Sequence, residues 1–372
     1  MPERRQRLAG NEVRLIENPG LREIKVEFHA AQELDMNKKL TSMLVIAAMF
    51  LGLNTNTAIA KDIFYYLGYG VVQVVDGDTD AIVADIPVNG WIRESAFTAD
   101  RKFLYVVTKR HLIHKIDLAE KQVVSTIDTG GAGWDRFIYG FDLAPDGKSA
   151  FVNLLSRTTQ KGEVVVTPPM LAQIDLQDGR IMRSIEMPWG STALVSVKNS
   201  TNIYVIGKDI VKVDVSGKEM KVIGSYPMFE KKWNILPLWD NTMENGGVFM
   251  ANYYTPELMG LVSIDTNSGE ITDTPLEGAP VFAYSVMSSP DKKKVYAVMD
   301  ELIVIDLESR SYEHVVPIPE GTNYAINISS DGKKIYVSGG GSTTTVFDAE
   351  SLKPISVLQM ESDGMDFRRL TF

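Results

Sequence analysis

"SSDGKKIYVSGG", Ser329 to Gly340, contains a turn followed by a short strand. Asp331 and Gly332 favour a chain reversal, because Asp can accept hydrogen bonds from the backbone just after it and Gly tolerates a positive φ. The β-branched and aromatic residues from Ile335 to Val337 suit a strand, which the glycine at Gly339 ends. The stretch therefore predicts a tight turn that leads into one strand of a β unit.

The same unit recurs along the chain. A strand that ends in Asp occurs seven times, and successive copies lie 41, 58, 39, 51, 41 and 42 residues apart. These aspartates are Asp76, Asp117, Asp175, Asp214, Asp265, Asp306 and Asp348. The two long spacings contain the insertions "SRTTQKGEVVVTPP" and "WDNTMENGG". Because an aspartate stands at this place in every unit, we expect these side chains to stabilise turns rather than to form an acidic site.

A period near forty residues, with several short strands and no helical periodicity, predicts radial β repetition, because stacked sheets bury faces that one small sheet cannot. We therefore expect an all-β fold, a seven-bladed β-propeller of four-stranded blades, over residues 61–372. The first unit lacks its inner strand, and "DFRRLTF", Asp366 to Phe372, is left over after the seventh. The ring is expected to be closed by this C-terminal strand pairing into blade one.

The segment before the propeller has the features of an export signal. "MNKKLTSMLVIAAMFLGLNTNTAIA", Met36 to Ala60, has two lysines, an apolar core and a small-residue end. These features predict a signal peptide cleaved after Ala60 and a periplasmic protein. Residues 1–35 carry seven acidic side chains, which an export signal normally lacks. We expect them to be disordered and to reflect a start assigned upstream of Met36; an unusually long leader is the alternative.

Composition narrows the classes of partner and chemistry. Removing residues 1–60 takes away eight basic and seven acidic side chains and changes the net charge from −10 to −11. We therefore expect neither nucleic acid nor a membrane as a partner. The chain has no cysteine, which excludes disulfides and covalently attached haem c. His111 and His114 lie three apart on a predicted strand, where they point to opposite faces, so no shared metal is expected.

Aromatic residues concentrate in one class of loop. The loops that lead from the outer strand of one blade to the inner strand of the next emerge on one face of the ring. The residues that we expect there are Trp91, Trp134, Asp135, Trp189, Trp233 and Tyr324. Two readings are open: contact with a partner or the substrate cavity, and packing between blades.

Two stretches resemble a known family. "NILPLWDNTMENGGVFMANYYT", Asn234 to Thr255, and the ending "DFRRLTF" resemble the beta subunit of quinohemoprotein amine dehydrogenase, as does the order of long and short blades. "KIYVSGG" and "KFLYVVT" are similar to the YVTN-type repeats of bacterial seven-bladed propellers. The resemblance spans residues 61–372.

The resemblance implies a periplasmic heterotrimer that oxidises primary amines. In that family a small subunit carries a cysteine tryptophylquinone, and electrons pass to a dihaem cytochrome c subunit. The propeller covers the small subunit and helps to wall the substrate cavity, so this chain itself is expected to hold no catalytic, cofactor-binding or metal-binding residue. Two other classes stay open: a stand-alone periplasmic propeller that binds a protein without catalysis, and an enzyme with a self-contained quinone or metal site.

Overall fold

A computed structural model describes residues 61–131, 133–196, 201–235, 240–319 and 321–372, together with three strands nearer the N-terminus. The chain divides into two compact units, Met1–Ile59 and Ala60–Phe372. In the first unit, β1 (Arg5–Leu8), β2 (Asn11–Ile16) and β3 (Lys25–Phe28) form an antiparallel sheet. The predicted signal peptide lies outside the described residues, so its cleavage stays a prediction, as does the upstream start.

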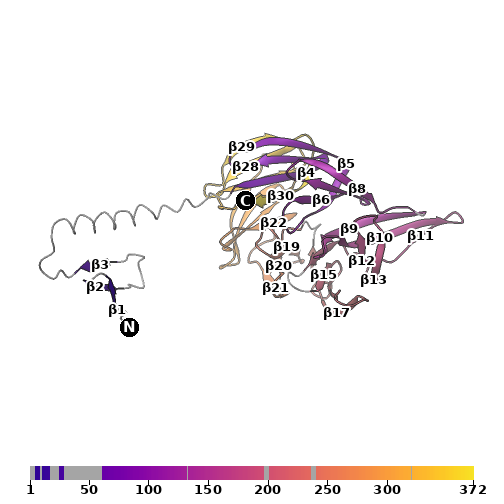
Figure 1. Cartoon of the computed structure of the whole chain (residues 1–372), viewed down its shortest axis with the longest axis horizontal. Coiled ribbons are helices and arrows are strands. Elements are labelled where there is room, and N and C mark those ends of the chain that lie inside the picture. The colour runs from indigo at the N-terminus through magenta and orange to yellow at the C-terminus, as the bar shows by residue number, and fades with distance from the viewer. Residues whose placement is uncertain are drawn as a thin grey trace. The chain divides into compact units, whose positions relative to one another are not determined.

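The second unit is a β-propeller built of antiparallel sheets (Figure 1). Four sheets have four strands each. The first two are β14 (Ala193–Ser196), β15 (Asn202–Ile206), β16 (Ile210–Asp214) and β17 (Lys221–Tyr226), and then β18 (Asn234–Ile235), β19 (Val248–Tyr254), β20 (Met259–Asp265) and β21 (Ile271–Pro275). The third is β22 (Ser285–Ser288), β23 (Lys294–Val298), β24 (Glu301–Asp306) and β25 (Ser311–Pro317). The fourth is β26 (Asn323–Ile328), β27 (Lys334–Gly339), β28 (Thr343–Asp348) and β29 (Pro354–Gln359).

Two further sheets are larger. One has five strands, β9 (Trp134–Leu143), β10 (Ser149–Gln160), β11 (Glu163–Val166), β12 (Met170–Asp175) and β13 (Ile181–Glu186). The other has six, in the order β30 (Gly364–Thr371), β4 (Asp62–Asp76), β5 (Ala81–Phe97), β6 (Phe103–Thr108), β7 (Leu112–Asp117) and β8 (Gln122–Asp128). The described part of residues 61–372 contains no helix that is long and apolar enough to cross a bilayer.

The prediction of seven four-stranded blades is wrong, because the described part of the propeller has six sheets. The residues expected to form blades one and two lie in a single six-stranded sheet. The cause is β5, which pairs with β4 through Pro87 and again at Trp91, and then with β6 from Ile92 onward. The loop that was expected between these two blades, with Trp91 in it, therefore lies inside a strand.

The predicted closure of the ring is wrong for the same reason, since no separate blade one exists for the C-terminal strand to complete. Instead β30 hydrogen-bonds antiparallel along β4, at the edge of the six-stranded sheet, with Phe367 opposite Tyr66. Figure 1 shows β30 beside β4, although they come from opposite ends of the propeller sequence.

Buried apolar clusters join each sheet to the next in sequence order. The last four-stranded sheet packs in turn on the six-stranded one, where the ring of Tyr336 lies 4.2 Å from that of Phe64 and 5.6 Å from that of Phe367. A further cluster lies within the six-stranded sheet and joins Val72 of β4 to Leu104 of β6. The sheets thus bury one another's faces, as the repeat predicts.

The strand-ending aspartates stabilise turns, which confirms that prediction. In each unit the Oδ1 atom accepts a hydrogen bond from a backbone N–H two or three residues further on. The acceptors are Asp76, Asp117, Asp175, Asp214, Asp265, Asp306 and Asp348. Asp348, for example, lies 2.7 Å from the amide nitrogen of Ser351.

Candidate functional site

A segment between β18 and β19, residues 240–247, leaves its own sheet and reaches β30, which belongs to a sheet three places further round the stack. We call it the crossing segment. Its Glu244 accepts hydrogen bonds from Arg368 of β30, at 2.8 Å from Nε and 3.3 Å from Nη2, and from the amide of Arg369 at 3.1 Å. Both charged side chains are almost fully buried, with 1% of Glu244 and 3% of Arg368 exposed.

Two asparagines fix the crossing segment to the strands on either side of it. Asn241 donates from Nδ2 to the carbonyl oxygens of Met250 and Val286, and its Oδ1 accepts from the amide of Met250. Asn245 accepts through Oδ1 from the amide and the hydroxyl of Ser288. The segment then turns back through Gly246 and Gly247, whose φ values of 65° and 90° favour glycine.

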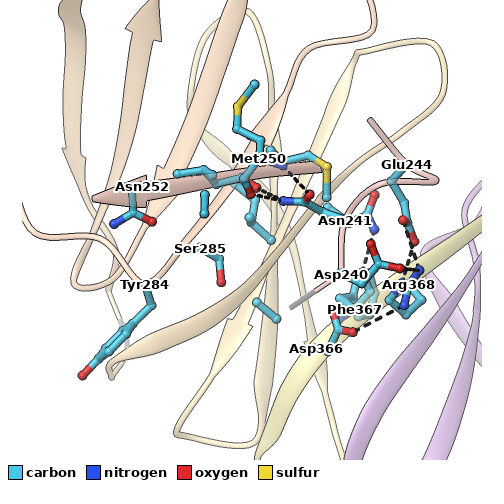
Figure 2. Close-up of a pocket in the computed structure, with 16 residues that line it drawn as sticks. Asp240, Asn241, Glu244, Met250, Asn252, Tyr284, Ser285, Asp366, Phe367 and Arg368 are labelled. Atoms are coloured by element: carbon cyan, nitrogen blue, oxygen red, sulfur yellow. Dashed lines mark hydrogen bonds and ion pairs between the residues drawn. The ribbon is translucent and has the colours of Figure 1, made fainter. Parts of the chain in front are cut away.

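A recess lies beside the crossing segment. It is open to solvent, and its cavity volume is about 20 Å³, which is room for about one water molecule. Asp240, Asn241 and Glu244 of the crossing segment form one wall, and Tyr284 together with β19, β22, β26 and β30 supplies the rest. Figure 2 shows a polar end with Asp240, Glu244, Asp366 and Arg368, while Asn252 and Tyr284 lie at the opposite end.

The polar end holds more carboxylates than the one arginine can neutralise. Arg368 lies 4.0 Å from both Asp366 and Asp240, in addition to its contact with Glu244. Burial raises the pKa of Asp366 to about 7, with the Glu244 charge adding to the rise and Arg368 opposing it. Asp366 therefore keeps its proton to a higher pH than a solvent-exposed aspartate does.

Two more carboxylates lie in the same interior electrostatic field. Burial raises the pKa of Asp142 on β9 to about 6, and the nearby charge of Asp240 adds to the rise. Burial also raises the pKa of Glu94 on β5 well above its ordinary value, while Arg110 opposes it and Asp366 adds to it. Both carboxyl groups therefore release their protons at a higher pH than solvent-exposed carboxyl groups do.

Of the residues predicted from the sequence, Tyr324 lies beside the recess. Its ring is 5.0 Å from that of Tyr284, which lines the recess, and its carbonyl oxygen accepts a hydrogen bond from the Ser285 hydroxyl. Trp233 instead stacks on Tyr253 at 3.9 Å with the rings 11° apart, and it packs against the core between two sheets.

The other predicted residues lie apart from the recess lining. The Trp91 ring is 5.3 Å from Tyr69. Trp134 begins β9, and Asp135 beside it forms an ion pair with Arg157. Trp189 is 59% exposed. Within the described ranges no ring contact joins any two of the predicted aromatic residues, so the structure brings only Tyr324 to the recess.

The two histidines singled out by their spacing have different partners. His111 Nδ1 lies 2.9 Å from Asp128, whereas buried His114 lies between the hydroxyls of Thr108 and Thr126 at 2.9 and 2.8 Å. In the part of the chain that the structure describes, no three His, Cys, Asp or Glu side chains are placed to hold a metal ion.

Sequence reasoning missed the carboxylates of the interior. A usable signal was present, because single acids interrupt inner-strand segments that are otherwise apolar, small or basic, as in "RESAF" with Glu94 and "YGFDLA" with Asp142. A charged residue at such a position is seldom buried unless it is paired. The ion pair of Glu244 with Arg368 could not be found this way, because 124 residues separate its members.

The comparisons with known proteins show the fold and not a family. No protein-family model matches the chain, and no curated protein matches its sequence. Solved structures match it along most of its length. Hydrazine synthase of Kuenenia stuttgartiensis is 17% identical with a TM-score of 0.52, covering 79% of this chain and 90% of that one.

Two other solved structures give the same picture. Dihydro-heme d1 dehydrogenase NirN is 14% identical with a TM-score of 0.53, covering 83% of this chain and 74% of that one. A functionally unknown protein from Desulfotomaculum acetoxidans is 14% identical with a TM-score of 0.57, covering 82% of this chain and 98% of that one. These likenesses establish a β-propeller, a fold that supports many functions.

Proposed function

We propose that the chain is the propeller subunit of a periplasmic amine dehydrogenase of the quinohemoprotein type. A small partner subunit would carry the cysteine tryptophylquinone, and a dihaem cytochrome c subunit would accept the electrons. This chain would hold the small subunit and wall the cavity for a primary amine. Its contribution to the reaction would be positioning and the exclusion of water.

One observation carries the proposal. The two stretches that resemble the family, residues 234–255 and 366–372, lie far apart in the sequence yet meet at the recess, where Glu244 binds Arg368. Both stretches supply lining residues, among them Asp240 and Asp366. Their joint use at one site supports a functional origin for the resemblance.

The chemistry of the recess also suits a cationic substrate at a subunit interface. Its polar end holds carboxylates, and aromatic side chains lie near its opposite end: Tyr284 lines it, and the Tyr254 hydroxyl accepts a hydrogen bond from Asn252 there. Phe282 lies 5.0 Å from Tyr254. Carboxylates attract a protonated amine, and aromatic faces can hold a cation or its alkyl tail.

The direct test is to purify the chain from its native host grown on a primary amine. We expect it to arrive with a small quinone-bearing subunit and a dihaem cytochrome c, and with amine-dependent reduction of the haem. The mature N-terminus, read by mass spectrometry, should be Lys61. Recovery of a lone colourless protein would favour the alternative, a stand-alone propeller that binds a protein without catalysis.

A matched pair of variants tests whether the small subunit docks on the loops that join an outer strand to the next inner strand. Trp189→Ala removes an exposed aromatic side chain from a loop between an outer strand and the next inner strand. Val357→Ala removes a similarly exposed apolar side chain from outer strand β29. We expect the first to weaken recovery of the small subunit and the second to leave it unchanged. Equal recovery with both variants would place the docking surface elsewhere.

A further inference from the structure

The insertion in the five-stranded sheet forms a β-hairpin arm, Arg157–Val166, that Figure 1 shows extending away from the propeller. Its strands β10 and β11 meet at a two-residue turn, Lys161 and Gly162, whose φ values are 51° and 84°. Positive φ at both positions is the geometry of a type I′ turn, which matches the twist of paired strands. The arm is therefore an ordered hairpin.

Among the residues that the structure describes, no strand pairs with one edge of the arm. β11 is the end strand of its sheet, and all four of its side chains are exposed. The exposed fractions are 66% for Val164, 39% for Val165 and 44% for Val166. Charges and prolines, which normally protect edge strands, flank the valines of β11 at Lys161, Glu163 and Pro168, but the three valines between them form an exposed apolar stretch that another strand could cover.

The hydrogen-bond pattern shows which backbone groups face outward. A two-residue turn makes Gln160 and Glu163 a hydrogen-bonded pair, so hydrogen-bonded pairs alternate along the hairpin from there. The bond from the amide of Thr167 to the carbonyl of Ser156, at 2.9 Å, fits this alternation. The N–H and C=O groups of Val164 and Val166 therefore point away from β10.

We propose that β11 pairs antiparallel with β11 of a second copy of this chain, on a twofold axis at Val165. In this register Val164 of each copy faces Val166 of the other, which joins the four outward-facing backbone groups of each copy in hydrogen bonds. This goes beyond the proposed function, which concerns partners of other kinds. An interface of this type is isologous, so each copy presents the same strand.

The side chains of this register are compatible with one another. Val164 and Val166 of both copies meet on one face of the new sheet, and the two Val165 side chains meet on the other. Glu163 lies opposite Thr167 of the second copy, so no like charges face each other. The arm, Arg157–Val166, carries two basic side chains and one acidic one, whereas the whole chain has a net charge of −10. The contact therefore brings together parts of the two copies that carry little net charge.

Charged substitutions at Val165, which lies on the proposed twofold axis, test the proposal. In Val165→Lys the two lysines of a dimer would face each other, and in Val165→Glu the two glutamates would. We expect either variant alone to raise the dissociation constant of the dimer by up to about fivefold, because like charges directly opposite destabilise a strand pair. A mixture of the two should recover the dimer. The readout is the molar mass by light scattering of the protein as purified, with whatever subunits accompany it.

One control variant and one further disrupting variant show whether the loss of the dimer arises at β11. Val124→Lys places a charge on outer strand β8, where the valine is 47% exposed, and should leave the mass unchanged. Val164→Pro removes an outward N–H and keeps the inward bonds of the hairpin, so it should also dissociate the dimer. A wild-type assembly with one copy of the chain at every concentration would overturn the proposal. So would loss of a different subunit, rather than of the second copy, in Val165→Lys.

Discussion

Glu244 and Arg368 form a buried, bidentate ion pair between parts of the propeller that are 124 residues apart in sequence. Arg368 also donates to the hydroxyl of Ser95 at 2.8 Å, and its guanidinium lies 5.5 Å from the centre of the Phe97 ring. The pair thus links the crossing segment, β30 and β5 at one point. Breaking it should disturb all three.

Replacing Glu244 by Gln should strongly destabilise the protein. The Arg368 guanidinium would keep its burial and lose its main counter-charge, and removing one member of a buried pair costs on the order of 3 to 5 kcal/mol. The measurement is the free energy of unfolding from denaturant titration. A double variant, Glu244→Gln with Arg368→Met, should be less destabilised than Glu244→Gln alone; a strictly additive loss would show that the two charges are not coupled.

Replacing Asp366 by Asn should change the pH dependence of stability. Because the folded pKa of about 7 lies above the value in an unfolded chain, the native state binds the proton more tightly. Stability from this group is therefore present below the unfolded pKa and is lost as pH rises through about 7. Between pH 5 and pH 8 the wild type should lose on the order of 2 kcal/mol that the variant keeps. Parallel stability curves for the two proteins would contradict the shift.

Replacing Trp233 by Ala should lower stability, because this side chain stacks on Tyr253 and packs between two sheets. We expect a loss of about 2 kcal/mol in the free energy of unfolding. Trp189→Ala is the comparison, since that side chain is mostly exposed and its removal should change stability by less than about 0.5 kcal/mol. Equal melting temperatures for the two variants would rule out the packing role of Trp233.

Deleting residues 367–372 should prevent stable folding. The deletion removes most of β30, exposes the edge of β4 and takes away the buried side chains of Phe367 and Leu370. It also leaves Glu244 without Arg368. The expected result is insoluble protein or a loss of the cooperative melting transition, and a soluble truncated chain with the wild-type melting temperature would contradict it. Removing Phe372 alone, which is 63% exposed, should have little effect.

Local chemistry made part of this fold predictable. The turns could be identified from Asp and Gly because each aspartate bonds to a backbone amide a few residues away. Strand class followed from β-branched runs such as Ile335 to Val337. The number of sheets could not be identified in the same way, because it depends on whether β5 breaks at residues 88–90, and pairing partners on both sides hold that strand continuous.

The site was less predictable than the fold. Tryptophans were singled out for their position in loops, yet a loop residue can pack inward, as Trp233 does, or stay exposed, as Trp189 does. The recess depends on contacts between residues far apart in sequence, and neither Glu244 nor Arg368 indicates its partner by local pattern. The three valines of β11 were visible in an insertion, but only the turn geometry shows which of their backbone groups face outward.

The pairing of β30 with β4 has a consequence for the order in which the molecule can assemble. The Thr371 hydroxyl donates a hydrogen bond to Asp62 at 2.6 Å, although 309 residues separate the two in the sequence. The first strand of the propeller therefore cannot form its complete set of contacts until the last strand has been made. While the polypeptide is being synthesised, the edge of β4 and the carboxylate of Glu244 have no partner. Contacts of such long sequence separation slow folding and leave strand edges open to aggregation. Pairing of β30 with β4 is therefore the completing step of folding, and the edge of β4 is protected from aggregation only after β30 has been made.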